Sequence, residues 1–180
     1  MLVHVLGSAA GGGFPQWNCG CPNCRGQRLG LIPAKARTQT SVAVSHDGHT
    51  WFLLHASPDI RIQIERTAVL HPRSSRHSPI AGILLTNGDL DQVLGLLSLR
   101  ENQSLHVYAT DRVRHGFMEG NSLYGTLCRT PDQVTWHALK LTVTDQLLLT
   151  AEGLPSGLTV TTFAVPGKVP LHLENKLPRD

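Results

Sequence analysis

The stretch that decides the fold is IAGILLTNGDLDQVLGLL, residues 80–97. Its first part, 80–86, is a short apolar run that ends at Asn87-Gly88, which predicts a strand buried on both faces. From 89 to 100 the apolar residues recur near a 3.6-residue period, and two aspartates stand in the first turn, where the helix dipole favours carboxylates. The stretch therefore predicts a buried strand, a polar loop and a helix in direct succession. Chemistry often takes place at the end of such a strand.

Strand-like segments surround this stretch. Residues 40–45 and 51–55 are separated by His46-Asp47-Gly48-His49, and Asp-Gly between two such runs predicts an antiparallel hairpin. After Ser57-Pro58, residues 60–64 fit either a helix or a strand, and a proline in the first helical position favours the helix. The other expected strands are 2–6, 105–109, 134–139, 146–149 and 158–165, with a helix from 111 to about 120.

Length and composition predict one soluble globular domain over residues 1–180. Hydrophobic residues make up 41% and charged residues 16%, and no apolar run approaches the roughly 18 residues that span a bilayer. A formal net charge of +3 with scattered basic residues gives no support to nucleic-acid binding. The first residues lack a basic secretory leader, so we expect a cytoplasmic protein with reduced thiols and no membrane span.

A cysteine-rich loop, which we place at 14–28, predicts a zinc site. Three of the four cysteines crowd into six positions: Cys19, Cys21 and Cys24. Disulfides among them would be badly strained, whereas this spacing lets the sulfurs reach one tetrahedral ion, and three thiolates select zinc. No fourth ligand lies nearby, since Cys128 is far away in sequence and His172 is the only histidine near the C-terminus. Two other interpretations stay open: reduced cysteines in an exposed loop, and a redox Cys-x-x-Cys, although the motif is not expected to open a helix after a strand.

The loop between the predicted strand and helix carries oxygen donors in the pattern of a metal site. It resembles the metallo-β-lactamase superfamily pattern Thr-His-x-His-x-Asp-His-x-x-Gly-Leu. On that pattern Asn87 and Asp89 take the places of the two leading histidines, Asp91 matches the aspartate, and Gln92 replaces the last histidine. Such an oxygen-rich site favours a harder ion than the zinc pairs of the hydrolases, or an ion that is held weakly. The alternative is a helix start capped by carboxylates, without a metal.

Further segments extend the resemblance over nearly the whole chain. They are 7–19 (GSAAGGGFPQWNC), 36–39 (ARTQ), 56–61 (ASPDIR), 78–80 (SPI), 85–91 (LTNGDLD) and 165–170 (VPGKVP). Together they resemble the coenzyme PQQ synthesis protein B family, and the long glycine-to-cysteine block is the most specific of them.

This resemblance implies an α/β fold, a metallo-β-lactamase-like αββα sandwich of which the chain forms the N-terminal half or more. It implies a role in pyrroloquinoline quinone (PQQ) biosynthesis, as an iron-dependent oxygenase acting on the tyrosine of a Glu-Tyr intermediate. The expected partners are a small peptide-derived precursor and other PQQ-synthesis proteins. Asp89 and Asp91 are then the expected catalytic and metal-binding carboxylates for Fe or Mn, and Asn87, Gln92 and Asp59 are further candidate ligands.

Two departures from the family pattern leave the choice between enzyme and carrier open. Gln92 stands where the family usually has a histidine. The family also extends beyond the point where this chain stops, so we expect a C-terminally truncated, incomplete domain with part of its core open. The alternative function is a non-catalytic carrier for transport of PQQ or its precursor to the periplasm. A zinc hydrolase or phosphodiesterase is less favoured, because three imidazoles are lost from the loop.

Overall fold

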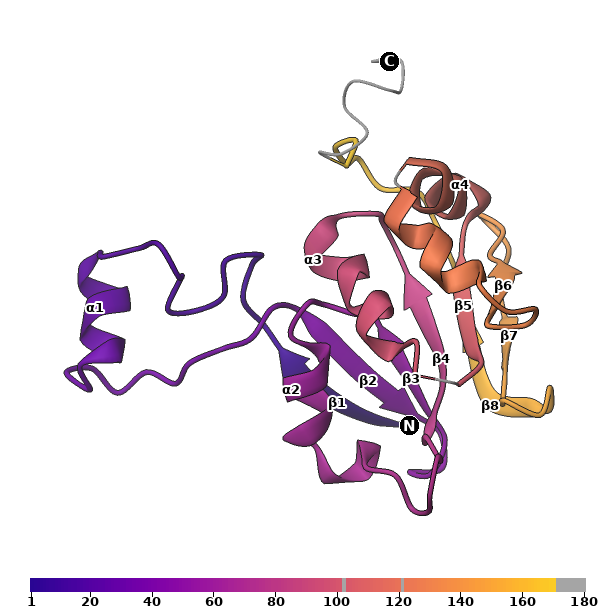
Figure 1. The fold of residues 1–180 in the computed structure, drawn as a ribbon, viewed down its shortest axis with the longest axis horizontal. Helices are drawn as coiled ribbons and strands as arrows, with labels where there is room; N and C mark the ends of the chain where they lie inside the picture. The colour runs from indigo at the N-terminus through magenta and orange to yellow at the C-terminus, as the bar shows by residue number, and fades with distance from the viewer. Residues whose placement is uncertain (102, 121, 171–180) are drawn as a thin grey trace.

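A six-stranded mixed sheet organises the computed structural model, which describes residues 1–101, 103–120 and 122–170 (Figure 1). The strands follow one another in chain order across the sheet: β1 (Leu2–Gly7), β2 (Ser41–Ser45), β3 (Trp51–Leu54), β4 (Ile80–Leu85), β5 (Leu105–Ala109) and β6 (Val134–Ala138). The first three pair antiparallel, whereas β3 to β6 pair in parallel. The carboxyl ends of these four parallel strands therefore meet at one edge of the sheet.

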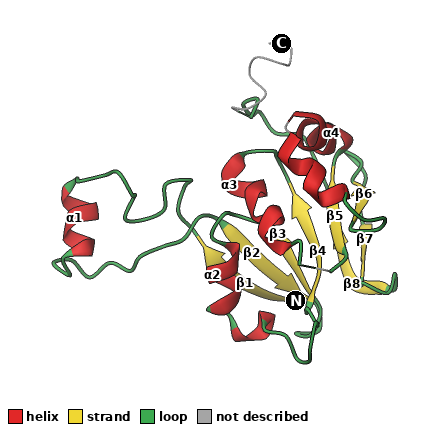
Figure 2. Cartoon of the chain, in the orientation of Figure 1, coloured by secondary structure: helices red, strands yellow, loops and turns green. Residues whose placement is uncertain are grey.

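Helices cover one face of this sheet (Figure 2). They are α2 (Ile60–Glu65), η1 (Ala68–Leu70), α3 (Leu90–Val93), η2 (Leu94–Leu99), α4 (Asp111–Gly120) and η3 (Ser122–Cys128). The larger hydrophobic core lies beneath them, where Ile83 and Val107 of the sheet pack in one cluster with Ile60, Leu96 and Phe117 of the helices. Burial of these apolar side chains is the main favourable contribution to folding.

The opposite face of the sheet packs against a two-stranded hairpin, β7 (Gln146–Leu149) and β8 (Pro155–Val160). Phe52, Leu84 and Tyr108 point to this side and form a second core with Leu148 and Leu158. The Tyr108 hydroxyl accepts a hydrogen bond from the Leu149 N–H at 2.9 Å, which fixes the hairpin to β5. Because successive residues of β4 belong to opposite cores, the prediction that this strand is buried on both faces is confirmed.

The predicted hairpin of β2 and β3 is confirmed, and so are strands at β1 and β5 and the helix from 111 to 120. The prediction of one regular helix from 89 to 100 is wrong beyond its first turn: α3 has four residues and continues as the 3-10 helix η2. Backbone bonding to a neighbouring segment explains the change. The Gln92 carbonyl accepts from the Ala56 N–H at 2.8 Å, and the Gly95 N–H donates to the Ala56 carbonyl at 2.9 Å, instead of to a carbonyl of its own helix.

Of three smaller expectations, two need correction. Helix α2 begins at Ile60 with Asp59 at its N-cap, so Ser57-Pro58 precedes the helix instead of opening it. The expectation that the cysteine motif does not open a helix after a strand is confirmed, because the motif leads into α1 (Pro22–Arg28) from a loop. The last predicted strand ends at Val160, because β7 offers no partner beyond Gln146. His172, the only histidine near the C-terminus, lies outside the described residues.

Candidate metal centres

The three clustered cysteines lie on an arm that projects from the body of the molecule and carries α1 (Figure 1). One ligand atom from each of Cys19, Cys21 and Cys24 lies within 4.8 Å of the other two. Arg28 holds the loop in this shape, because its guanidinium donates hydrogen bonds to the carbonyls of Cys19 and Gln16. All three thiols are free, so their spacing suits one shared ion.

The cluster also changes the acidity of its thiols. A hydrogen bond from the Cys24 backbone, with further ones from the Cys19 and Cys24 side chains, lowers the pKa of Cys21 to about 7. At Cys24 a hydrogen bond with the Gln16 backbone acts to lower the pKa, but burial and the neighbouring thiols outweigh it and raise the pKa. Cys128 takes no part, since it lies exposed at the end of η3. The thiolate is the form that binds metal, so the lowered pKa of Cys21 increases the fraction of thiolate available to bind an ion at neutral pH.

The second candidate centre is the loop that follows β4 at the carboxyl edge of the sheet. Its turn is held by Asn87, whose side-chain oxygen accepts a hydrogen bond from the Asp89 N–H at 2.9 Å. Asp89 occupies the N-cap of α3, yet its side chain makes no capping hydrogen bond. The helix start is therefore not capped by a carboxylate in the way the metal-free alternative requires. Gln92 places its Oε1 in a buried position without a hydrogen-bond partner.

A histidine that the sequence interpretation did not select lies beside this loop. His55 directly follows β3, and its Nε2 lies 3.3 Å from the Thr86 hydroxyl. Burial lowers the pKa of His55, and the negative charge of Asp91 opposes that shift, which places the carboxylate within electrostatic range of the ring. The sequence did offer one signal for His55: a lone histidine directly follows a predicted strand, at the carboxyl edge of the sheet where functional residues often lie.

The base of the cysteine arm forms one wall of the region around residues 87–92. A cavity of about 390 Å³ is lined by residues of 11–17 and 36–39 and, along α2 from its N-cap to its C-cap, by Asp59, Ile62 and Arg66. Asp59 lies in this wall, where its Oδ2 accepts a hydrogen bond from the Gln39 N–H at 3.0 Å. Gly11 faces the loop, because a Cβ built there would lie 3.4 Å from the Asp91 carboxylate. The structure thus places Asp59 in the adjoining cavity wall, and Asn87, Asp89, Asp91 and Gln92 in the loop itself.

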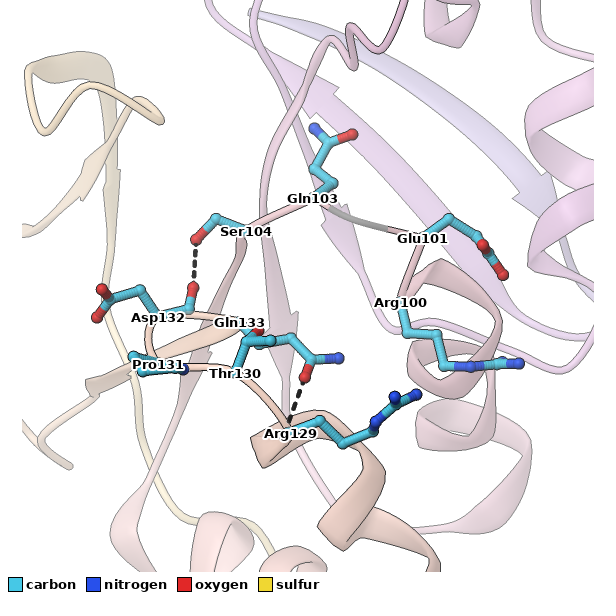
Figure 3. A pocket seen from close by; sticks show the side chains of 9 residues that line it. All are labelled: Arg100, Glu101, Gln103, Ser104, Arg129, Thr130, Pro131, Asp132 and Gln133. Carbon is cyan, nitrogen blue, oxygen red and sulfur yellow. Dashed lines mark hydrogen bonds between the residues drawn. The ribbon is translucent and has the colours of Figure 1, made fainter.

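A larger cavity of about 530 Å³ lies elsewhere (Figure 3). Ser104 and Gln133, which line it, precede β5 and β6 and so mark the amino ends of these strands. Figure 3 shows the Ser104 hydroxyl bonded to the Asp132 carbonyl, at 2.8 Å. The candidate metal loop, residues 87–92, lies at the opposite, carboxyl edge of the sheet, so this cavity contributes nothing to it.

Comparison with known proteins agrees with the fold and the motifs. The model of the Beta-lactamase superfamily domain matches residues 50–178. Coenzyme PQQ synthesis protein B of Methylobacterium sp. (strain 4-46) is 50% identical over 99% of this chain, and that of Rhodopseudomonas palustris (strain TIE-1) is 49% identical over 98%. The chain spans 56% of the length of each of these relatives.

Solved structures give the same result. The crystal structure of Zn(2+)-bound PqqB from Methylobacterium extorquens is similar with a TM-score of 0.85 and 48% identity, covering 98% of this chain and 56% of that one. A diphosphatase of the PhnP family, 24% identical, shares the fold with a TM-score of 0.59 over 81% of this chain and 52% of its own. The predicted resemblance and the metallo-β-lactamase fold are thus confirmed, and the chain belongs to the beta-lactamase superfamily.

Proposed function

We propose that this chain serves PQQ biosynthesis as a metal-dependent, oxygenase-type protein that acts on the tyrosine of a Glu-Tyr intermediate. The relatives at about half identity carry the name of that pathway. The observation that carries the chemical part of the proposal is the loop from Asn87 to Gln92, which presents carboxylates and an unpartnered amide oxygen at the carboxyl edge of four parallel strands.

The donor set of this loop fits an iron or manganese ion. Carboxylate and amide oxygens are ligands that hard divalent ions accept, and the buried Gln92 Oε1 has a hydrogen-bonding capacity that the protein leaves unused. In this proposal Asp91 and Asp89 hold the ion, Gln92 is a weak ligand, and Asn87 keeps the turn in shape through its bond to Asp89. When bound, iron supplies open coordination positions and redox chemistry toward oxygen.

We propose a separate, structural zinc for the cysteine arm. Three sulfur ligands within 4.8 Å of one another match a tetrahedral site, and the similar PqqB structure from Methylobacterium extorquens is Zn(2+)-bound. Replacement of Cys21 by serine is expected to lower zinc stoichiometry and soluble yield together, as measured by elemental analysis. The matched control is Cys128→Ser, which removes an exposed thiol outside the cluster. Unchanged zinc content and yield in the Cys21 variant would make the cluster incidental.

The reaction can be tested with a Glu-Tyr dipeptide, oxygen and a two-electron reductant such as ascorbate. Hydroxylation inserts one oxygen atom into the tyrosine ring, and the reductant supplies the two electrons that convert the other oxygen atom to water. We expect iron-loaded protein to give the hydroxylated dipeptide by mass spectrometry, and Asp91→Asn to give none. Product formed equally by both proteins would contradict the role of the loop.

A carrier for PQQ or its precursor, transporting it to the periplasm, is the second candidate. Gln92 favours it, because an amide binds a divalent ion less well than the imidazole of the superfamily pattern. A carrier binds PQQ in calorimetry with equal affinity in wild type and Asp91→Asn, and oxidises no dipeptide. The zinc hydrolase is the third candidate, and it requires a zinc-activated water that a loop without histidines is poorly suited to hold.

A further inference from the structure

We infer that His55 is the imidazole ligand of the metal loop, acting together with Asp91. This inference rests on the proposed metal function of residues 87–92 and names a ligand that lies outside the loop. It is carried by three features of His55: its backbone conformation, the hydrogen bonding of its ring, and its attachment to the loop.

The backbone of His55 is held in an unusual conformation. Its φ is 70°, in the left-handed region that residues other than glycine rarely occupy. The position is fixed on both sides, since the His55 N–H donates to the Leu84 carbonyl at 2.9 Å and its own carbonyl accepts from the Ser41 hydroxyl at 3.1 Å. A strained residue of this kind, held by surrounding bonds, is characteristic of functional sites.

The ring of His55 has one engaged nitrogen and one unused nitrogen. Nε2 lies 3.3 Å from the Thr86 hydroxyl, whereas Nδ1 is buried and has no hydrogen-bond partner. Metal-binding histidines commonly donate the N–H of one nitrogen to a neighbouring oxygen, which leaves the lone pair of the other for the ion. In the tautomer that carries its proton on Nε2 and donates it to Thr86, Nδ1 of His55 has that free lone pair.

The main chain brings His55 to the metal loop. The next residue, Ala56, exchanges backbone hydrogen bonds of 2.8 and 2.9 Å with Gln92 and Gly95, so the end of β3 and the start of α3 are joined directly. Gln92 contributes the second buried polar atom without a partner in this region, its Oε1. In this inference the donors are one imidazole nitrogen, the Asp91 carboxylate and this amide oxygen, a nitrogen-and-oxygen set that differs from the thiolates of the arm.

Other histidines of the described chain are engaged elsewhere. His4 packs edge-on against Trp51 at 5.1 Å between ring centroids, and His106 bonds to His137 at 2.9 Å between ring nitrogens. The three cysteines are also the only group of three or more histidine, cysteine or acidic residues that meets metal-ligand spacing within the described residues. His55, Asp89 and Asp91 therefore do not reach that spacing as a set of three, and the donor set inferred here combines His55 and Asp91 with the amide oxygen of Gln92.

The test uses the zinc-loaded chain with Mn²⁺ as the probe, because thiolates select softer ions than manganese. Pulsed EPR of the bound Mn²⁺ detects the nitrogen of a coordinated imidazole, which a purely structural role of His55 would not produce. The key variant is His55→Asn, since asparagine also tolerates a left-handed backbone and the protein should fold. His115→Asn is the matched control, on an exposed histidine that pairs with Glu119.

We expect wild type and His115→Asn to bind one Mn²⁺ with the nitrogen signal. His55→Asn should lose that signal and bind at least about tenfold more weakly. Adding Gln92→His to His55→Asn should restore both, because an imidazole returns to the same site. A nitrogen signal that persists in His55→Asn overturns the inference and leaves the metal loop intact. Absence of Mn²⁺ binding in wild type overturns the metal loop itself, and the inference with it.

Discussion

Replacement of Gly95 by alanine should destabilise the protein strongly, because this glycine lies against the backbone of Ala56 and Ser57, the residues that follow His55. A Cβ at Gly95 would lie 2.2 Å from the Ser57 carbonyl oxygen and 2.6 Å from that of Ala56. Contacts between carbon and oxygen normally begin near about 3.3 Å, so the two segments would have to separate by about 1 Å. That separation breaks the hydrogen bonds that join Ala56 to Gln92 and Gly95.

The expected loss of stability is the sum of the broken hydrogen bonds and the overpacking. Two lost hydrogen bonds cost about 1 kcal/mol each, and overpacking against atoms that cannot rotate away costs about 1–3 kcal/mol more. A total of about 3–5 kcal/mol should lower the melting temperature by about 6–20 °C in a chain of this length. Differential scanning calorimetry measures the shift. Gly125→Ala is the matched control, since Gly125 also lies in a 3-10 helix and has no atom within 4 Å of the added Cβ. A Gly95→Ala protein that melts with wild type would refute the reasoning.

Three further outcomes are expected. Gln63 is 1% exposed, and its side chain makes three hydrogen bonds. Gln63→Leu leaves the buried partners unpaired, so it should lower the free energy of unfolding in urea by about 2–4 kcal/mol, and a loss below about 1 kcal/mol would contradict this. Burial and the nearby His106 lower the pKa of His137, so the unfolded chain binds the proton better than the folded chain does. The free energy of unfolding should therefore fall as the pH drops below about 6.5. His137→Asn should flatten this dependence, and an unchanged slope of stability against pH would exclude His137 as its cause. Hydrogen bonds from the Thr50 and His49 backbone lower the pKa of Asp47, so its carboxylate stabilises the folded chain at neutral pH. Asp47→Ala should therefore cost about 1 kcal/mol of stability at pH 7, and nothing at a pH low enough to protonate the carboxylate. Thermal melts at several pH values measure this difference.

The sequence predicts those parts of the fold that local patterning determines. The Asp47-Gly48 turn identifies the β2–β3 hairpin, and the apolar run at 80–86 identifies β4, because both signals arise from neighbouring residues. The change from α3 to the 3-10 helix η2 was not predictable in this way. It depends on backbone hydrogen bonds to Ala56, some 36 residues earlier in the chain, and periodicity carries no information about such a partner.

The same division applies to the candidate metal centres. The cysteines of the arm are close in sequence and were predicted together, and the structure places their ligand atoms together. His55 was passed over among ten scattered histidines, because its proximity to Asp91 arises only when β3 and β4 pair in parallel. Its left-handed backbone and unpartnered Nδ1 are properties of the folded chain. The spacing of residues in the sequence carries no information about either property.

The two centres are also linked through the segments that support the arm. The bridge between Ala9 and Gln39 and the bridge between Phe14 and Arg37 fasten both ends of the arm to each other at its base. From that base Gln39 donates a backbone hydrogen bond to Asp59, and Gly11 lies against the Asp91 carboxylate, so the arm forms one wall of the loop region. Zinc bound by the cysteines would stiffen the arm at its far end, while the bridges fix the wall near Asp91 independently of it. The geometry of the loop should therefore depend on the base of the arm more than on the zinc, which separates the structural role of one metal from the chemical role proposed for the other.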